Sequence, residues 1–343
     1  MRANRWVYML LAMLLVFGIA GCEVATENGT DDNDNGSAEE TGTSDTTALI
    51  EAWAESLHSK PVTFAAERTP CASCHDGRAF AENVNDPSQL ETGPVGPYVT
   101  PTDCRACHTG RGLEVMDAGS TDAVPTAEGS VEGGKGALCM ECHNQFGEPD
   151  INDEERGYPH YGPQADVLNG TGGMTEGLNL VSTIDHFEIE DTCVGCHMAD
   201  EEGAGHSFTP SEAVCEECHN DFTSAEDIIA DADYDGNGQA EAFVTEVEGL
   251  MSALETAINA TANSTEFAAQ SGSIVFKSND TTMTTVPTPA YMGAYNWELI
   301  DHDSSRGIHN PFFTVSLLQE TYRQMTGAAI PNAQPPQADD EDE

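Results

Sequence analysis

The residues of this chain that could do chemistry fall into five copies of one pentapeptide, C-x-x-C-H, between positions 71 and 219. This motif attaches c-type haem, because two thiols at this spacing reach the two vinyl groups of one porphyrin and the next histidine falls over the iron. The copies use ten of the eleven cysteines. Their members are Cys71, Cys74 and His75; Cys104, Cys107 and His108; Cys139, Cys142 and His143; Cys193, Cys196 and His197; and Cys215, Cys218 and His219.

Zinc is the main alternative cofactor for these motifs, because thiolates and neutral imidazoles also bind zinc. A zinc site does not need a histidine directly after every second cysteine, yet all five copies have one. A chance match or a redox dithiol would explain one copy but not five. We therefore predict five covalently bound haems, each with its motif histidine as the proximal ligand.

Six histidines outside the motifs are candidates for the opposite face of each iron: His58, His160, His186, His206, His302 and His309. Five haems bound by histidine on both faces would use five of them and leave one. Methionine is the alternative ligand and would raise the reduction potential. The candidate methionines are Met116, Met140, Met174 and Met198, of which Met140 and Met198 lie too close to their own motifs.

The first 21 residues read as an export signal. Arg2 and Arg5 precede an apolar stretch that is too short for a membrane span, and Ile19-Ala-Gly-Cys22 closes it. This ending resembles a bacterial lipobox, which implies cleavage before Cys22 and a lipid on its sulfur, whereas the alternative is a spare buried thiol. We expect an exported outer-membrane lipoprotein, at the cell surface, outside the cell or on the periplasmic face. The lipid would be its only contact with the membrane.

The composition is strongly acidic, with 60 Asp and Glu, 12 Lys and Arg and a formal charge of -48. Nucleic acid is excluded as a partner, because phosphate binding needs clustered basic residues. Apolar content is only 38%, and glycine and proline number 32 and 17. We therefore expect a mainly irregular fold, in which short α-helices pack around five haems that supply much of the core, with little β-structure. The proximal histidines are 33, 35, 54 and 22 residues apart, so no regular repeat organises them.

Changes in composition along the chain predict its domains. Residues 22–47 form a disordered acidic tether, 48–222 the haem-binding region, 223–327 a helical segment that completes the haem domain, and 328–343 a disordered acidic tail. The sequence predicts helices over 47–58, 240–262 and 290–299, short helices at the motifs, and a loop or hairpin over 263–289. Thr223 and Glu226 form a capping box for a helix that ends near Ala230. Asn310 and Pro311 begin a last helix that ends at Gly327.

An acidic loop precedes the helix predicted at 240–262. Asp231, Asp233 and Asp235, followed by Gly236, resemble the start of an EF-hand calcium loop. The last acid, Glu241, is at position 11 instead of 12, and Gly238 replaces the usual apolar residue. Calcium binding and an ordinary acidic loop both remain open.

Four local contexts of non-motif histidines resemble those of multihaem c-type cytochromes of bacterial respiration. They are Tyr158-Pro-His160-Tyr-Gly-Pro, His186 seven residues before Cys193, Gly205-His206-Ser-Phe, and Gly307-Ile-His309-Asn-Pro. The helical segment after the acidic loop is similar to that of pentahaem and other cytochromes from metal-reducing bacteria, some of which form extracellular filaments. The resemblance extends over roughly residues 58–326. It implies that His160, His186, His206 and His309 are distal ligands, with His58 as the fifth and His302 to spare, although a neighbouring protomer could also supply a ligand.

The resemblance implies electron transfer, because an iron with histidine on both faces has no open position for substrate. We expect a lipid-anchored electron carrier that passes electrons to redox proteins or an extracellular acceptor, either as a single molecule or as a subunit that self-associates into filaments. The alternative is an enzyme that resembles pentahaem nitrite or hydroxylamine reductases, with one open haem. Those enzymes typically bind the catalytic haem through C-x-x-C-K, whereas all five motifs here end in histidine.

Overall fold

The computed structural model describes residues 46–90, 99–199 and 205–337. Helix accounts for 44% of these residues and strand for 7%, which confirms the prediction of little β-structure. They belong to one compact unit, Ser44–Glu343. The predicted signal peptide, the lipid site at Cys22, most of the tether and the last six residues of the tail lie outside the described residues.

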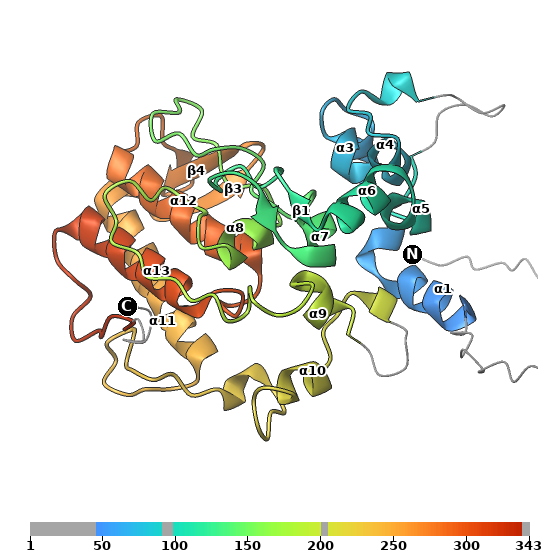
Figure 1. Ribbon diagram of the computed structural model, residues 1–343. Coiled ribbons are helices and arrows are strands. Elements are labelled where there is room, and N and C mark those ends of the chain that lie inside the picture. The colour runs from blue at the N-terminus through green and yellow to red at the C-terminus, as the bar shows by residue number, and fades with distance from the viewer. Residues whose placement is uncertain (1–45, 91–98, 200–204, 338–343) are drawn as a thin grey trace, which may run out of the picture. The chain divides into compact units, whose positions relative to one another are not determined.

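Short helices make up the part of the unit that carries the motifs (Figure 1). This part also contains a two-stranded antiparallel ribbon. In it, β1 (Ser120–Thr121) pairs with β2 (Val131–Glu132). The α-helices are α1 (Thr46–Glu55), α2 (Thr63–Ala66), α3 (Ala72–His75), α4 (Gly77–Ala81), α5 (Cys104–His108), α6 (Gly110–Ala118), α7 (Ala137–Met140), α8 (Gln164–Leu168), α9 (Cys193–His197) and α10 (Glu212–Glu216). The 3-10 helices are η1 (Leu57–Ser59), η2 (Pro87–Gln89), η3 (Gly134–Gly136), η4 (Gly205–Ser207) and η5 (Ala225–Asp227).

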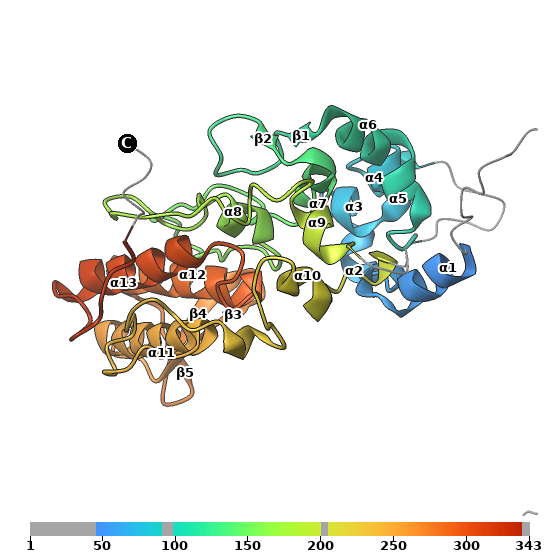
Figure 2. The same ribbon diagram turned by 60° about the horizontal axis from the view of Figure 1, so that its bottom comes forward.

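Three long helices form the C-terminal segment, and each contacts the other two: α11 (Phe243–Ala262), α12 (Thr288–Asp303) and α13 (Pro311–Thr326). Beside them lies an antiparallel sheet with the strand order β3 (Glu266–Gln270), β4 (Ser273–Ser278) and β5 (Thr281–Thr282) (Figure 2). The helices predicted over 240–262 and 290–299 are thereby confirmed, and residues 263–289 contain the hairpin.

The ends of the last helix follow from its sequence. The Asn310 side chain accepts a hydrogen bond from the Phe313 amide, Pro311 occupies the first turn, and Gly327 ends the helix in the left-handed region at φ 77°. The capping box predicted at Thr223 and Glu226 is wrong by one residue. Ser224 and Asp227 form it, and the Asp227 carboxylate accepts hydrogen bonds from the amides of Thr223 and Ser224. The predicted helix up to about Ala230 is also wrong, because a 3-10 helix of three residues is found there.

Side-chain cores are distributed unequally along the chain. The large core lies mainly among α11, α12, α13 and the β3–β4 hairpin; its fully buried members include Leu250, Leu254, Ile258, Ile274, Phe276, Leu299, Phe313, Leu317 and Leu318. The second core, in the motif region, has only five buried members: Val124, Val131, Met140, Ala165 and Leu168. Helix α1 buries none of its residues. The motif region therefore has little apolar core of its own.

The chain beyond α13 is ordered further than the sequence predicts. Ile330 is buried, and the Gln334 amide donates a hydrogen bond of 2.8 Å to the Asp233 carbonyl. The predicted disordered tail is therefore wrong for the residues around 330–334, because an apolar side chain and backbone hydrogen bonds fix them. None of the described helices is both long enough and apolar enough to span a bilayer.

Candidate metal centre: five histidine pairs

Each motif folds as a short helical turn, as predicted. The turns coincide with or overlap α3, α5, α7, α9 and α10. Residues three apart in a helix lie on the same face, so the two thiols of each motif point to one side, and the histidine follows within the same turn. All ten motif cysteines are free thiols.

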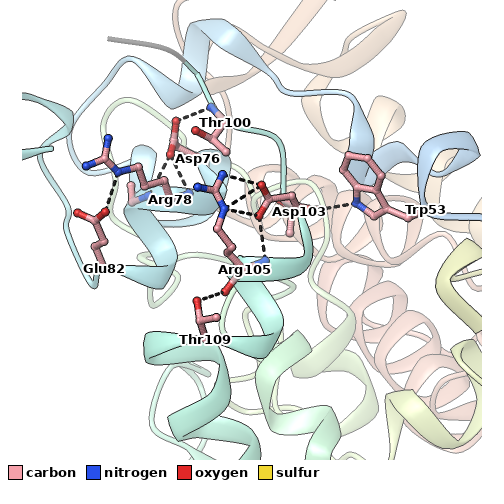
Figure 3. Close-up of polar contacts among 10 residues, drawn as sticks. Trp53, Asp76, Arg78, Glu82, Thr100, Asp103, Arg105 and Thr109 are labelled. Carbon is pink, nitrogen blue, oxygen red and sulfur yellow. Dashed lines mark hydrogen bonds and ion pairs between the residues drawn. The ribbon is translucent and has the colours of Figure 1, made fainter. Parts of the chain in front are cut away.

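The carboxylate of Asp76 fixes the first motif. It accepts hydrogen bonds from the amides of Arg78 and Ala79, which caps α4 directly after His75. Its second oxygen accepts from the Thr100 amide at 2.8 Å (Figure 3). The segment that follows His75 is thereby tied to the segment that leads into the second motif.

Asp103 positions the second motif in the same way. Its carboxylate caps α5 through the Arg105 amide and pairs with the Arg105 guanidinium at 2.7 Å (Figure 3). The Trp53 indole donates a hydrogen bond of 2.8 Å to the Thr102 carbonyl, which connects α1 to this motif. Hydrogen bonds thus set the direction in which Cys104 and the rest of α5 enter.

Each motif histidine lies opposite one histidine from outside the motifs. A metal ion bound at about 2 Å by one nitrogen of each of two imidazoles separates the ring centres by roughly 6 Å. The five pairs all have this separation: His58–His143 at 6.1 Å, His75–His160 at 5.9 Å, His108–His206 at 6.2 Å, His186–His219 at 6.3 Å and His197–His309 at 6.2 Å. The geometry therefore fits one metal ion in each pair.

Backbone oxygens set the tautomer of several paired histidines. A carbonyl oxygen can only accept, so the ring nitrogen that faces it carries the proton and the other nitrogen is free to bind a metal. The Nδ1 atom donates in this way from His160 to the Tyr161 carbonyl at 2.9 Å, from His186 to the Ile308 carbonyl at 2.6 Å and from His197 to the Phe208 carbonyl at 3.0 Å. His143 Nδ1 faces the side-chain oxygen of Gln164 at 3.1 Å. In all four rings Nε2 is the nitrogen available to a metal.

Burial favours the neutral form of several paired histidines. Desolvation, followed by the charge of His143, lowers the pKa of His58 to about 4. Burial also lowers the pKa of His75, His143 and His206. Neutral imidazole is the form that ligates a metal, so these environments suit that role near neutral pH.

His302 is the one non-motif histidine that faces no motif histidine among the described residues. It is buried in α12, where Nδ1 donates to the Pro159 carbonyl at 2.9 Å and Nε2 lies 3.2 Å from a Glu298 oxygen. Burial opposes its charged form, but the hydrogen bonds to Glu298 and to the Pro159 carbonyl, together with the negative charges of Glu298 and Asp301, outweigh this and raise its pKa. The five histidines proposed as distal ligands are those in the pairs, and His302 is the spare.

The five motifs also lie close together. The Cys74 thiol of the first motif donates a hydrogen bond of 3.7 Å to the Glu141 carbonyl of the third, and the Thr192 hydroxyl, directly before the fourth, donates one of 2.8 Å to the Gly133 carbonyl, shortly before the third. Arg111, three residues after the second motif, pairs with Glu141, and His219 of the fifth faces His186, seven residues before the fourth. All five motifs therefore form one connected group.

Apolar side chains lie exposed beside the histidine pairs. Leu57, Phe146, Tyr161, Ile184 and Ile308 are each within three residues of a paired histidine and are 40% to 83% exposed. Apolar side chains that are scattered singly are ordinary on a protein surface, whereas ones gathered at a site mark a surface that another group covers. These five are next to paired histidines in the sequence, so porphyrins held between the pairs would lie near them, and the residues present fit haem.

The thiols do not converge as zinc ligands would. A tetrahedral zinc site brings four ligand atoms to within bonding distance of one point. Across the described ranges, two groups of three or more side chains have ligand atoms within 4.8 Å of one another, and neither contains a motif residue: Glu298, Asp301 and His302; and Asp233, Asp235 and Glu246. The geometry favours haem over zinc.

The acidic loop closes on a residue that the sequence did not suggest. Glu246, fully buried in α11, accepts hydrogen bonds from the amides of Tyr234, Asp235 and Glu241. Its carboxylate lies with those of Asp233 and Asp235, whereas Asp231 and Glu241 lie outside this group. Calcium binding here stays a prediction, and Glu246 replaces Glu241 as the acid nearest to the loop carboxylates.

Sequence reasoning missed the residues that hold the ligands. Gln164 orients His143, and Asp303 accepts a hydrogen bond of 2.7 Å from His309 Nδ1. Neither stands at a spacing that marks a motif.

No family model, curated protein or solved structure matches this chain.

Proposed function

We propose that this protein is an electron carrier that holds five c-type haems, each between two histidines. The observation that carries the proposal is the set of five histidine pairs with ring centres 5.9 to 6.3 Å apart. When bound, each haem supplies an iron that accepts and releases one electron. The motif cysteines and histidines would attach it, and His58, His160, His186, His206 and His309 would fill the opposite faces.

The connected group of motifs supports electron relay. The Cys74–Glu141 and Thr192–Gly133 hydrogen bonds bring the first and fourth motifs next to the third. Because every motif histidine has a partner within the chain, no ligand from a second protomer is needed. The same pairing favours a carrier over a nitrite or hydroxylamine reductase, which needs one open iron.

Several parts of the proposal rest on the sequence alone. Export, lipidation at Cys22, a place at the outer surface, transfer to an extracellular acceptor and assembly into filaments remain predictions. Calcium binding at the acidic loop is separate from electron transfer. Calorimetry of chelator-treated protein tests it, since no heat on adding calcium at millimolar levels would end the idea.

Alanine substitutions of the paired histidines test the proposed function. His160→Ala in the haem-loaded protein should leave five haems attached, because the thiols remain, and should convert one iron from low to high spin. Electron paramagnetic resonance would report the spin state and mass spectrometry the haem number. His302→Ala is the comparison: it removes the histidine outside the pairs, which contacts the Pro159 carbonyl before His160 but faces no motif histidine, so it should leave all irons low-spin. If His302→Ala created the high-spin iron and His160→Ala did not, the assignment would be wrong.

A further inference from the structure

The paired histidines differ in what their Nδ1 atom contacts. His160, His186 and His197 donate to backbone carbonyls. His143 contacts the side-chain amide oxygen of Gln164. The Nδ1 atom of His206 is buried with no partner in the described part of the chain. Only His309 has a carboxylate partner within these ranges, Asp303. One pair of the five, His197–His309, therefore has a carboxylate in contact with one of its imidazoles.

Asp303 is buried, and a second hydrogen bond fixes its side chain against His309. Its side chain is 0% exposed, and its Oδ1 atom lies 2.7 Å from His309 Nδ1. The other carboxylate oxygen accepts a hydrogen bond from the Ser305 hydroxyl. No Lys or Arg of the described ranges pairs with Asp303. Its negative charge thus faces the imidazole of His309 without a neutralising cation.

A carboxylate in this position acts on a metal through the ligand. It fixes the tautomer and raises the basicity of the imidazole, which strengthens its bond to the more highly charged ferric iron. A buried negative charge also favours the oxidised over the reduced iron, and the low local dielectric enlarges this effect. Both effects lower the reduction potential.

We propose that Asp303 gives the iron between His197 and His309 the lowest reduction potential of the five. The inference rests on the proposed function. The fourth motif lies between the third and the fifth, since the Thr192 hydroxyl directly before it donates to the Gly133 carbonyl beside the third, and His186, which faces His219 of the fifth, donates to the Ile308 carbonyl next to His309. The lowest potential therefore belongs to an internal position of the group and not to an end.

Asp303→Asn tests this in the intact haem-loaded protein, because asparagine keeps an acceptor oxygen and the side-chain shape but removes the charge. A spectroelectrochemical titration should show the lowest midpoint potential rising while the other four stay unchanged. Electron paramagnetic resonance should show one of five low-spin signals shifting. Glu320→Gln is the control, since it neutralises a carboxylate of α13 that pairs with Arg323 and contacts no histidine, and it should move no midpoint.

A second variant should shift the lowest midpoint potential in the opposite direction, and it tests the inference if Asp303→Asn does not fold. Ser305→Ala removes the hydroxyl that shares the carboxylate charge, so the lowest midpoint should fall. Five low-spin haems with an unchanged lowest midpoint in the folded variant would overturn the inference and leave the proposed function intact. Fewer than five haems, or no low-spin iron, in the unmodified protein would overturn the proposed function itself.

Discussion

Among single residues, His302 has the surroundings that most clearly require a proton. Its Nδ1–H donates to the Pro159 carbonyl, so a neutral ring would direct the lone pair of Nε2 at the Glu298 carboxylate 3.2 Å away. A proton between the two atoms removes this repulsion and makes a buried ion pair, in which both side chains are 5% exposed. The raised pKa of His302 agrees with this arrangement.

His302→Asn should lower the free energy of unfolding by about 3 kcal/mol at pH 6, because it leaves Glu298 buried without its partner. The pKa of His302 is raised in the folded state, so its contribution is fully present below the unfolded value of about 6.5. It is lost as the pH rises through the folded value. Denaturant unfolding at pH 6 and pH 9 measures the difference, which should shrink at pH 9. Asp301→Asn, at an exposed neighbour, should change stability by at most about 0.5 kcal/mol.

The members of the histidine pairs could be predicted from the sequence, but their pairing could not. C-x-x-C-H marks five of these histidines by spacing alone. The partner histidines lie between 33 and 112 residues away, as in His186–His219 and His197–His309, so only the tertiary fold brings them together. Asp303 gave no signal, because an acid six residues before a histidine does not follow the helical period, and the connection between α12 and α13 brings the two side chains together.

At the scale of elements, the end of α12 connects three histidine pairs. Gln164 donates to the Asp303 carbonyl while its oxygen faces His143. His302 holds the Pro159 carbonyl directly before His160, and the Asp303 side chain holds His309. The C-terminal helices therefore position histidines whose pairs include motifs far earlier in the chain.

The fold of this segment follows from the sequence where local signals exist. Asn310, Pro311 and Gly327 mark the ends of α13, and the apolar period marks α11. The Ser224–Asp227 cap and the packed residues near Ile330 depend on which hydrogen bonds and apolar contacts form in three dimensions. Propensity and spacing do not record those contacts.

Gly293 of α12 sets how closely the three long helices pack. A Cβ atom there would lie 2.3 Å from Met325 Sδ of α13 and 2.9 Å from Ile258 Cγ1 of α11. Gly293→Ala should therefore destabilise the protein by about 1 to 3 kcal/mol, although alanine favours helix. Ser252→Ala on the exposed side of α11 is the control, with a change below about 0.5 kcal/mol. A more stable Gly293→Ala protein in denaturant unfolding would contradict this packing.

At the scale of the whole molecule, the motif region has a small apolar core, and the chain carries a large negative charge. The five-residue core of the motif region contrasts with the large core of the C-terminal helices. In the described ranges, seven Lys and Arg side chains already pair with a carboxylate, so the net charge of -48 has few free cations beside it. Five porphyrins between the histidine pairs would provide the apolar surface that the side chains of this region lack.

The most direct test of this account counts the haems and the spin states of their irons in one oxidised sample. Mass spectrometry should find five haems per chain, and low-temperature electron paramagnetic resonance should find five low-spin ferric irons. The account predicts no high-spin iron even in dilute protein, because every ligand comes from the same chain. Fewer than five haems, or a persistent high-spin signal from one iron in five, would contradict it.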